Sequence, residues 1–475
     1  MSRGTICLPF LNLYYPLSRF ELIHKSLKIK KGLRLELKGG VEPGMQYKNI
    51  DARLVAMTPD DFPGMIPKLE KKEGEKVVKG EALWHDKTDE LLKVVSPVNG
   101  TIKEIVRGEK RKLLRVTIEV SEDSVDLPKN PSVIAGDRKK ICERIIEAGL
   151  WTMIRRLPFD IVPSSSSVPR DIFITAWDAA PLASGMKECR ERFGIENLQA
   201  GVDALKKITD GKVYIGFDSK ESFPELNDAE EVAIEGDYPA SLPSVLAANI
   251  SPVNKGETVW LTDIVTVGRI GQTVQGKEVD WSFPVAVTGS EVNTPCNVWA
   301  PAGVKISELL AVSGLKHEDD DRVISGNVFT GINVGKDGYL RYPYRQVTVI
   351  PEGSHRDEFM GWASMNPSKI SVNRSFPSFF LRKKKFSPDA RLNGGRRSMI
   401  MSGEYDKVLP MDIMGEYLIK AILSRDIEKM ENLGIYEVTP ADFSAAEFVD
   451  TSKLELQKIV REGLDYMIKE IGKGE

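Results

Sequence analysis

The pattern of apolar and polar residues changes character several times along the chain, and each change predicts a different kind of structure. From residue 27 to about residue 130, short alternating segments are separated by turns that end in glycine, as at Gly74 and Gly80. The segment Ser96–Ile102 repeats the style of the segment around these turns. Two such halves facing each other form a flattened barrel, so we expect a barrel-sandwich domain of the biotinyl/lipoyl type over residues 27–130.

Helical and strand patterns then alternate over residues 131–254. The segment Arg138–Glu147 is amphipathic and predicts a helix, whereas Ile172–Ala176 and Lys212–Phe217 are short apolar runs typical of buried parallel strands. A helical pattern over Gly201–Ile208 lies between those two runs. This order predicts a Rossmann-like α/β domain.

Residues 255–350 are again rich in strand patterns. Val259–Val267 and Phe283–Val287 are predicted strands, a helix is expected from Ser307 through Leu315, and Arg322–Ser325 is a further strand. Strand, strand, helix, strand in a segment of this size predicts a β-grasp domain.

The last part of the chain predicts helices. Apolar residues recur with the helical period over Asp412–Leu423 and Leu454–Ile471. Thr439-Pro440-Ala441-Asp442 combines a capping hydroxyl, a first-turn proline and an acid near the positive end of a helix. We expect a helical bundle over residues 401–475. The predicted fold is therefore multidomain, of α/β and α+β type.

A connecting segment over residues 351–400 contains a basic loop. Arg382–Lys385 supplies four successive cations flanked by phenylalanines. Such a loop can rest on an anionic bilayer or on an acidic protein surface, because a basic residue near such a surface contributes about 1 kcal/mol. A solvated charged loop is the alternative interpretation.

Composition excludes several classes of function. The net charge of −3 is too close to neutral to indicate a nucleic-acid partner. The four cysteines are widely separated and form no metal-ligand spacing, so no metal site is predicted. No run approaches the roughly 20 apolar residues that a membrane span requires. Residues 1–26 are expected to be an extension without a fold of its own, or a stretch upstream of a misplaced start codon.

Candidate chemistry lies where the strand Ile172–Ala176 ends. In an open α/β sheet this crevice usually holds a cofactor, and glycines bring backbone amides close to its phosphate. Here the loop over residues 153–163 contains no glycine, although Arg155 and Arg156 can supply charge, and the strand end carries Asp178. We interpret these three residues as a degenerate flavin site.

Several short motifs in order give the chain a family resemblance. They are Lys30-Lys31-Gly32-Leu33, Gly149-Leu150-Trp151-Thr152, Asp237-Tyr238-Pro239-Ala240, Arg322-Val323-Ile324-Ser325-Gly326, Phe359-Met360-Gly361-Trp362, Asn393-Gly394-Gly395-Arg396-Arg397-Ser398-Met399 and Val408-Leu409-Pro410-Met411-Asp412. From residue 27 to its end the chain resembles the A-type subunit of the bacterial sodium-translocating NADH:quinone oxidoreductases. More distantly it resembles the NADH-oxidising flavoprotein subunit of respiratory complex I and its counterpart in Rnf-type complexes, without their glycine-rich flavin loop and cluster cysteines.

The resemblance implies a peripheral subunit on the cytoplasmic face of the bacterial inner membrane. It implies five partner subunits, which carry the NADH, FAD, FMN and iron–sulfur chemistry and include a membrane subunit that shares the quinone site. This chain would serve assembly and, as a hypothesis, quinone binding. The quinone-proximal candidates are Phe62, Met65, Pro158 and Phe159, whose alternative role is to plug a disused pocket.

Two other functions stay open at this point. The chain could be a flavin-dependent NADH dehydrogenase subunit, which would be recognised by bound FMN. It could also be a β-grasp or carrier module with a covalent arm on Lys87, in the predicted hairpin of the barrel. No residue of the chain has the arrangement of an independent catalyst.

Overall fold

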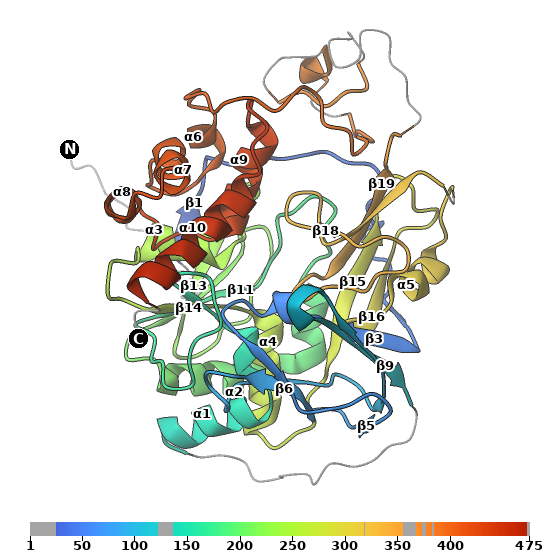
Figure 1. Cartoon of the computed structure of the whole chain (residues 1–475), viewed down its shortest axis with the longest axis vertical. Helices are drawn as coiled ribbons and strands as arrows, with labels where there is room; N and C mark the ends of the chain where they lie inside the picture. Colours follow the sequence, from blue (N-terminus) through green and yellow to red (C-terminus); the bar gives the residue numbers. More distant parts are fainter. Residues whose placement is uncertain are drawn as a thin grey trace, which may run out of the picture.

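A computed structural model describes residues 25–121, 136–317, 319–354, 367–372, 377–381 and 384–472. These residues form two six-stranded sheets, two smaller sheets and a group of C-terminal helices (Figure 1). The multidomain α/β architecture expected from the sequence is confirmed. None of the helices within these ranges is long and apolar enough to cross a membrane.

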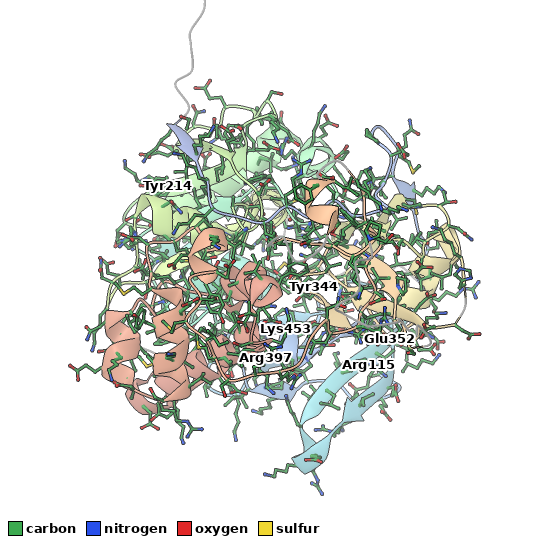
Figure 2. All side chains as sticks on the ribbon, turned by 90° about the horizontal axis from the view of Figure 1, so that it is seen from above. Arg115, Tyr214, Tyr344, Glu352, Arg397 and Lys453 are labelled. Carbon is green, nitrogen blue, oxygen red and sulfur yellow. The ribbon has the colours of Figure 1, made fainter. Side chains whose placement is uncertain are left out.

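The two smaller sheets make up the barrel-sandwich domain. All their strand pairs are antiparallel. One sheet has the order β3 (Leu54–Met57), β9 (Leu113–Val120), β8 (Gly100–Arg107), β5 (Lys76–Val77), and the other has the order β4 (Pro67–Leu69), β6 (Ala82–Asp86), β7 (Lys93–Val95). Arg115 of β9, labelled in Figure 2, lies over the ring of Tyr339 at 5.0 Å and joins this domain to the second large sheet.

The chain before the barrel differs from the expected division at residue 27. Lys25 and Ser26, expected to belong to an extension without a fold, begin strand β1 (Lys25–Lys28), which pairs with the first large sheet. Further on, β2 (Lys48–Asn49) joins the second large sheet. Residues 1–24, the rest of the predicted extension, lie outside the described residues.

The first large sheet is parallel except for one edge strand. Its order is β1, β13 (Ala229–Glu235), β12 (Val213–Asp218), β11 (Ile172–Thr175), β14 (Val259–Asp263), β10 (Arg155–Leu157), with β10 antiparallel to β14. Successive residues of β11 point to opposite faces, as the strand period requires. Ile172 and Ile174 belong to one buried cluster, whereas Phe173 between them belongs to the other.

Helices pack against both faces of this sheet (Figure 1). The cluster of Ile172 and Ile174 includes residues of α1 (Arg138–Glu147), α2 (Lys187–Ile208) and α4 (Ile264–Val274). The cluster of Phe173 includes α3 (Pro243–Ile250) and the C-terminal helices. The helix predicted over Arg138–Glu147 is therefore confirmed, and that over Gly201–Ile208 is the second half of α2.

The predicted boundary between residues 254 and 255 is wrong. Strand β14 pairs with β11 and belongs to the first sheet, and the chain from Ile264 onward is helix α4 rather than the continued strand predicted over Val259–Val267. A short apolar run rich in β-branched residues cannot be told from a buried helix by its period. The α/β domain therefore extends through α4.

The second large sheet is mixed. Its order is β18 (Ile332–Asn333), β17 (Asp321–Ser325), β19 (Gln346–Pro351), β15 (Ser282–Thr288), β16 (Cys296–Pro301), β2. The neighbours β15 and β19 are parallel, and α5 (Ile306–Ser313) packs on β15.

The C-terminal helices are α6 (Tyr405–Val408), α7 (Gly415–Leu423), α8 (Ile427–Asn432), α9 (Ser444–Val449) and α10 (Leu456–Ile471). The predicted helix start at Thr439 is present as a capping box that opens the 3₁₀ turn Pro440–Phe443 and leads into α9. Of the predicted basic loop, Arg382 and Lys383 lie outside the described residues.

Candidate functional site

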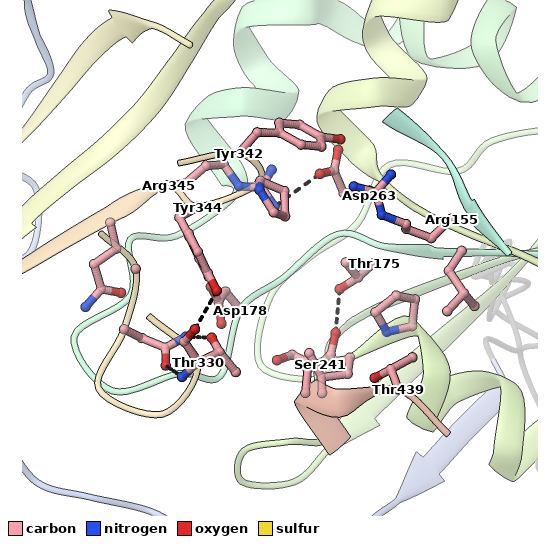
Figure 3. A pocket seen from close by; sticks show the side chains of 18 of the residues that line it. Arg155, Thr175, Asp178, Ser241, Asp263, Thr330, Tyr342, Tyr344, Arg345 and Thr439 are labelled. Atoms are coloured by element: carbon pink, nitrogen blue, oxygen red, sulfur yellow. Dashed lines mark hydrogen bonds and ion pairs between the residues drawn. The ribbon is translucent and has the colours of Figure 1, made fainter. Parts of the chain in front are cut away.

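A cavity of about 440 Å³ lies at the carboxyl ends of β11 and β14 (Figure 3). From β11 the chain crosses to β12 on one side, whereas β14 lies on the other side, so the strand order reverses here. Open α/β sheets bind ligands at such a switch point. The segment Gly326–Gln346 of the second sheet and the turn at Thr439 close the cavity from the other domains.

An ion pair between domains borders the cavity. Asp263, at the end of β14, caps α4 by accepting the Thr266 amide at 2.8 Å, and its other carboxylate oxygen lies 3.3 Å from the Arg345 guanidinium. Burial opposes the charge of Arg345, but the carboxylate of Asp263 prevails and raises the pKa of the guanidinium. The pair holds the second sheet against the α/β domain (Figure 3).

A second clamp joins the barrel to the same segment. Asp61 accepts the Arg341 Nε at 2.6 Å and the Tyr342 amide at 3.1 Å, and its backbone carbonyl accepts Arg155 at 2.5 Å. Burial raises the pKa of the Asp61 carboxyl. The ring of Phe62 stacks on Tyr342 with centroids 5.5 Å apart.

Three acidic or phenolic groups facing the cavity are harder to ionise than usual. Asp178 accepts the Ala180 amide at 2.9 Å and is exposed toward the cavity, yet the surrounding protein raises the pKa of its carboxyl through desolvation. Burial likewise raises the pKa of Tyr342 and Tyr344 to about 12. These groups keep their protons more readily than exposed ones do.

Three polar atoms of the cavity lining have no hydrogen-bond partner within the described ranges. They are Trp177 Nε1, Thr262 Oγ1 and Arg345 Nη1. Trp177 and Thr262 are at least nine-tenths buried. A buried donor without a partner costs about 1–3 kcal/mol, so a ligand that satisfies these groups is favoured here.

The charge of the lining does not fit FMN. Five aspartates line the cavity against three arginines, and a phosphate monoester adds about two further negative charges. Helix α2 begins at the cavity edge, where a phosphate would be expected. However, the Glu188 carboxylate already covers that end, 3.7 Å from where a Cβ on Gly185 would lie.

The structure brings only some of the predicted site residues to this cavity. Arg155 and Asp178 line it. Arg156 is buried with its guanidinium 6.0 Å from the Phe159 ring, and it does not line the cavity. Phe159 is buried against Tyr436 of the C-terminal region, so its bulk does not fill the crevice.

The other candidates stand behind the cavity wall. Phe62 is buried, Met65 is partly buried and Pro158 is buried, whereas Pro63, beside Phe62, does line the cavity. Sequence reasoning missed the segment Arg341-Tyr342-Pro343-Tyr344-Arg345. The signal available was the concentration of aromatic and cationic residues in a short return toward the last strand.

Other chemistry is not assembled in the described part of the chain. Its His, Cys, Asp and Glu residues form no group of three or more that could hold a metal ion. Cys142, Cys189 and Cys296 are free thiols. Lys87 is exposed in the connection between β6 and β7, as predicted.

Comparison with known proteins gives one consistent result. Three family models match successive parts of the chain: the NqrA N-terminal barrel-sandwich hybrid domain over residues 27–121, the NqrA second alpha/beta domain over 136–277, and the NQRA C-terminal domain over 284–336. Curated relatives are named as the A-type subunit of Na(+)-translocating NADH-quinone reductase. One from Rhodopirellula baltica is 33% identical over 93% of this chain and 98% of its own. One from Neisseria meningitidis serogroup B is 32% identical over 94% of this chain and 100% of its own.

Among solved structures, a NAD+-reducing [NiFe]-hydrogenase in the H2-reduced state is 12% identical, covering 74% of this chain and 66% of that chain with a TM-score of 0.35. That similarity is too low to carry an argument about fold or function.

Proposed function

Because the chain belongs to the NqrA family, the A-type subunits of the Na(+)-translocating NADH-quinone reductases, we propose that its cavity receives the headgroup of the quinone that the complex reduces. In this proposal the chain is a peripheral subunit on the cytoplasmic face of the membrane. The flavins and iron–sulfur centres that carry electrons from NADH reside on partner subunits. The chain contributes assembly contacts and part of the quinone site.

The observation that carries the proposal is the chemistry of the cavity at the switch point between β11 and β14. A quinone headgroup is flat, neutral and has two carbonyl oxygens that accept hydrogen bonds. The lining offers aromatic rings, an excess of carboxylates that repels phosphates, and unpartnered donors at Trp177, Thr262 and Arg345. A volume of about 440 Å³ lies within the usual range for small-molecule sites.

Reduction of a quinone to a quinol takes up two electrons and two protons. This chain's contribution is to bind, orient and hold protons, while partner subunits supply the electrons. Asp178 reaches the cavity and has a pKa raised by burial, so it is suited to hold a proton near a quinone oxygen.

The four candidates from the sequence act in this proposal as a second layer. Phe62 supports Tyr342 by stacking on its ring. Met65, Pro158 and Phe159 fill the space behind the loops that carry Pro63 and Asp160 to the cavity. We further propose that the α/β domain is Rossmann-like, that the second sheet with α5 is a β-grasp domain, and that the C-terminal helices form a bundle.

The test uses the assembled complex and a pair of matched substitutions. Thr262→Val removes a buried hydroxyl that lines the cavity and has no partner within the described ranges. Thr273→Val removes another such hydroxyl, on α4 away from the lining. If Thr262 donates to the quinone, the KM for quinone rises about threefold to tenfold in Thr262→Val alone. NADH oxidation by an artificial acceptor stays unchanged in both.

A photoactivatable quinone gives an independent readout. We expect labelled peptides from residues 171–186 and 339–346, with the label displaced by excess quinone. Labelling confined to other subunits, together with an unchanged KM in Thr262→Val, would overturn the quinone assignment. Bound FMN in the purified chain would instead favour the flavin-dependent alternative.

A further inference from the structure

A second cleft, of about 1120 Å³, lies on a different part of the molecule and shares no lining residue with the first. It is bordered by the connecting segment Ser387–Arg397, by Arg322 of β17, and by the junction between α9 and α10. The segment Asn393–Met399, one of the motifs behind the family resemblance, forms one side through Arg397. The proposed quinone site gives that motif no role.

The charge of this cleft is positive. Six basic residues line it against three acidic ones, and each acid has a local partner. Asp389 binds Arg391 at 2.7 Å, and Glu455 binds Arg396 at 2.6 Å. Glu447 accepts the Gln457 amide at 2.9 Å and so caps the start of α10.

Two of the cations have nothing to neutralise them. Neither Arg397 nor Lys453 has a side-chain partner among the described residues, and both line the cleft (labelled in Figure 2). The Arg397 amide donates to the Ser452 carbonyl at 2.9 Å, which holds the two residues' segments together. Lys453 also has a φ of +59°, a conformation that costs a lysine about 1–2 kcal/mol.

The backbone beside these cations is open. Gly394 has a φ of +113°, and a Cβ there would lie 3.9 Å from the Lys453 Cε. A Cβ on Gly395 would meet nothing within 4 Å. Within the described ranges, no acceptor binds the amide of either glycine. Successive free amides beside cations are the arrangement in which proteins hold a phosphate.

We propose that this cleft binds a phosphate group, held by the Gly394 and Gly395 amides and by the charges of Arg397 and Lys453. The side chains of Leu392 and Phe448 also line the cleft and are 56% and 39% exposed. The phosphate can therefore come from a phospholipid headgroup, whose chains would contact those side chains, or from a free phosphate. The proposal is independent of the quinone site.

The test measures binding of the full chain to two probes. One is inorganic pyrophosphate in solution, followed by calorimetry. The other is a set of vesicles, of phosphatidylcholine alone or mixed equally with phosphatidylglycerol, followed by co-sedimentation. Binding to the mixed vesicles alone identifies a lipid headgroup as the source, and binding to pyrophosphate alone identifies a free phosphate. Binding to neither probe would overturn the proposal.

Three variants separate a built site from general electrostatics. The double substitution Arg397→Gln with Lys453→Gln is expected to lower affinity about tenfold or more. Lys420→Gln with Lys469→Gln removes the same charge from exposed positions on α7 and α10 and is expected to change little. Gly395→Ala keeps every charge and meets no neighbour, yet its methyl group would occupy the phosphate's place. Equal losses in both double variants, with no effect of Gly395→Ala, would overturn the proposal.

Discussion

Asp442 is a buried carboxyl whose surroundings define a residue-scale test. It closes the capping box by accepting the Thr439 amide at 2.6 Å, and it accepts the Ser244 hydroxyl of α3 at 2.6 Å. Burial nevertheless outweighs these hydrogen bonds and raises its pKa to about 6. The site that joins α3 to the C-terminal helices is therefore sensitive to pH.

The sign follows from proton binding. Between about pH 4 and pH 6 the folded chain keeps a proton on Asp442 that the unfolded chain has lost, so this group's contribution to stability falls as pH rises. The full loss is on the order of 3 kcal/mol, reached above pH 6. We expect Asp442→Asn to remove this component. Thermal midpoints measured from pH 4 to pH 7 should therefore show the wild type losing stability relative to the variant.

Glu462→Gln is the matched control, because it removes an exposed carboxyl from α10. Its midpoint should follow the wild type at a constant offset. A pH profile of Asp442→Asn parallel to the wild type would show that Asp442 is ionised throughout this range.

Single residues were the hardest part of the candidate site to predict. Arg155 and Asp178 could be found because they flank a recognisable strand end, and both reach the cavity. Arg345 and Tyr342 lie more than 160 residues further along the chain and meet that strand end only through packing between domains. The charge balance that disfavours a phosphate likewise arises only when three domains contribute their side chains.

At the scale of elements, the glycines of α2 and α4 explain how these helices pack. A Cβ on Gly271 would lie 1.7 Å from the Asn197 carbonyl oxygen, and one on Gly201 would lie 2.1 Å from the Val267 carbonyl oxygen. The two backbones therefore touch. Both helices lie on one face of the first sheet, and α4 starts at the Asp263 cap that borders the cavity.

We expect Gly271→Ala to destabilise the fold by more than about 3 kcal/mol, because the atom in the way belongs to backbone and cannot move aside. The measurement is the thermal midpoint of the purified chain. Gly40→Ala is the control, since its nearest neighbour would be a leucine methyl at 3.4 Å. Equal midpoints for the two variants would show that α2 and α4 can separate without cost.

Elements were predictable where their period was long or their ends were marked. The helix Arg138–Glu147 and the apolar stripe that became α10 agree closely with the structure. The run Val259–Val267 was not, because its first half is a strand and its second half a helix buried on nearly every side. A glycine at each of positions 268 and 271 reflects close helix packing, which a single sequence does not distinguish from a turn.

At the scale of the whole molecule, Phe329 connects three domains. Its ring stacks on Tyr238 of the α/β domain, with centroids 4.8 Å apart, and meets Phe448 of α9 edge-on at 5.9 Å. Its carbonyl accepts Gln457 of α10 at 2.9 Å. The side chain is 7% exposed.

We expect Phe329→Ala to weaken the attachment of the C-terminal helices more than it weakens either sheet. Loss of a buried phenylalanine costs about 3–5 kcal/mol, and here the lost contacts all lie between domains. Limited proteolysis should therefore cut the variant between the second sheet and α6 under conditions in which the wild type stays intact. Tyr417→Ala, which removes a ring that is 58% exposed on α7, should leave the wild-type pattern. Unchanged cleavage in Phe329→Ala would mean that contacts such as the Tyr238–Ser444 hydrogen bond, 2.9 Å long, hold the helices on their own.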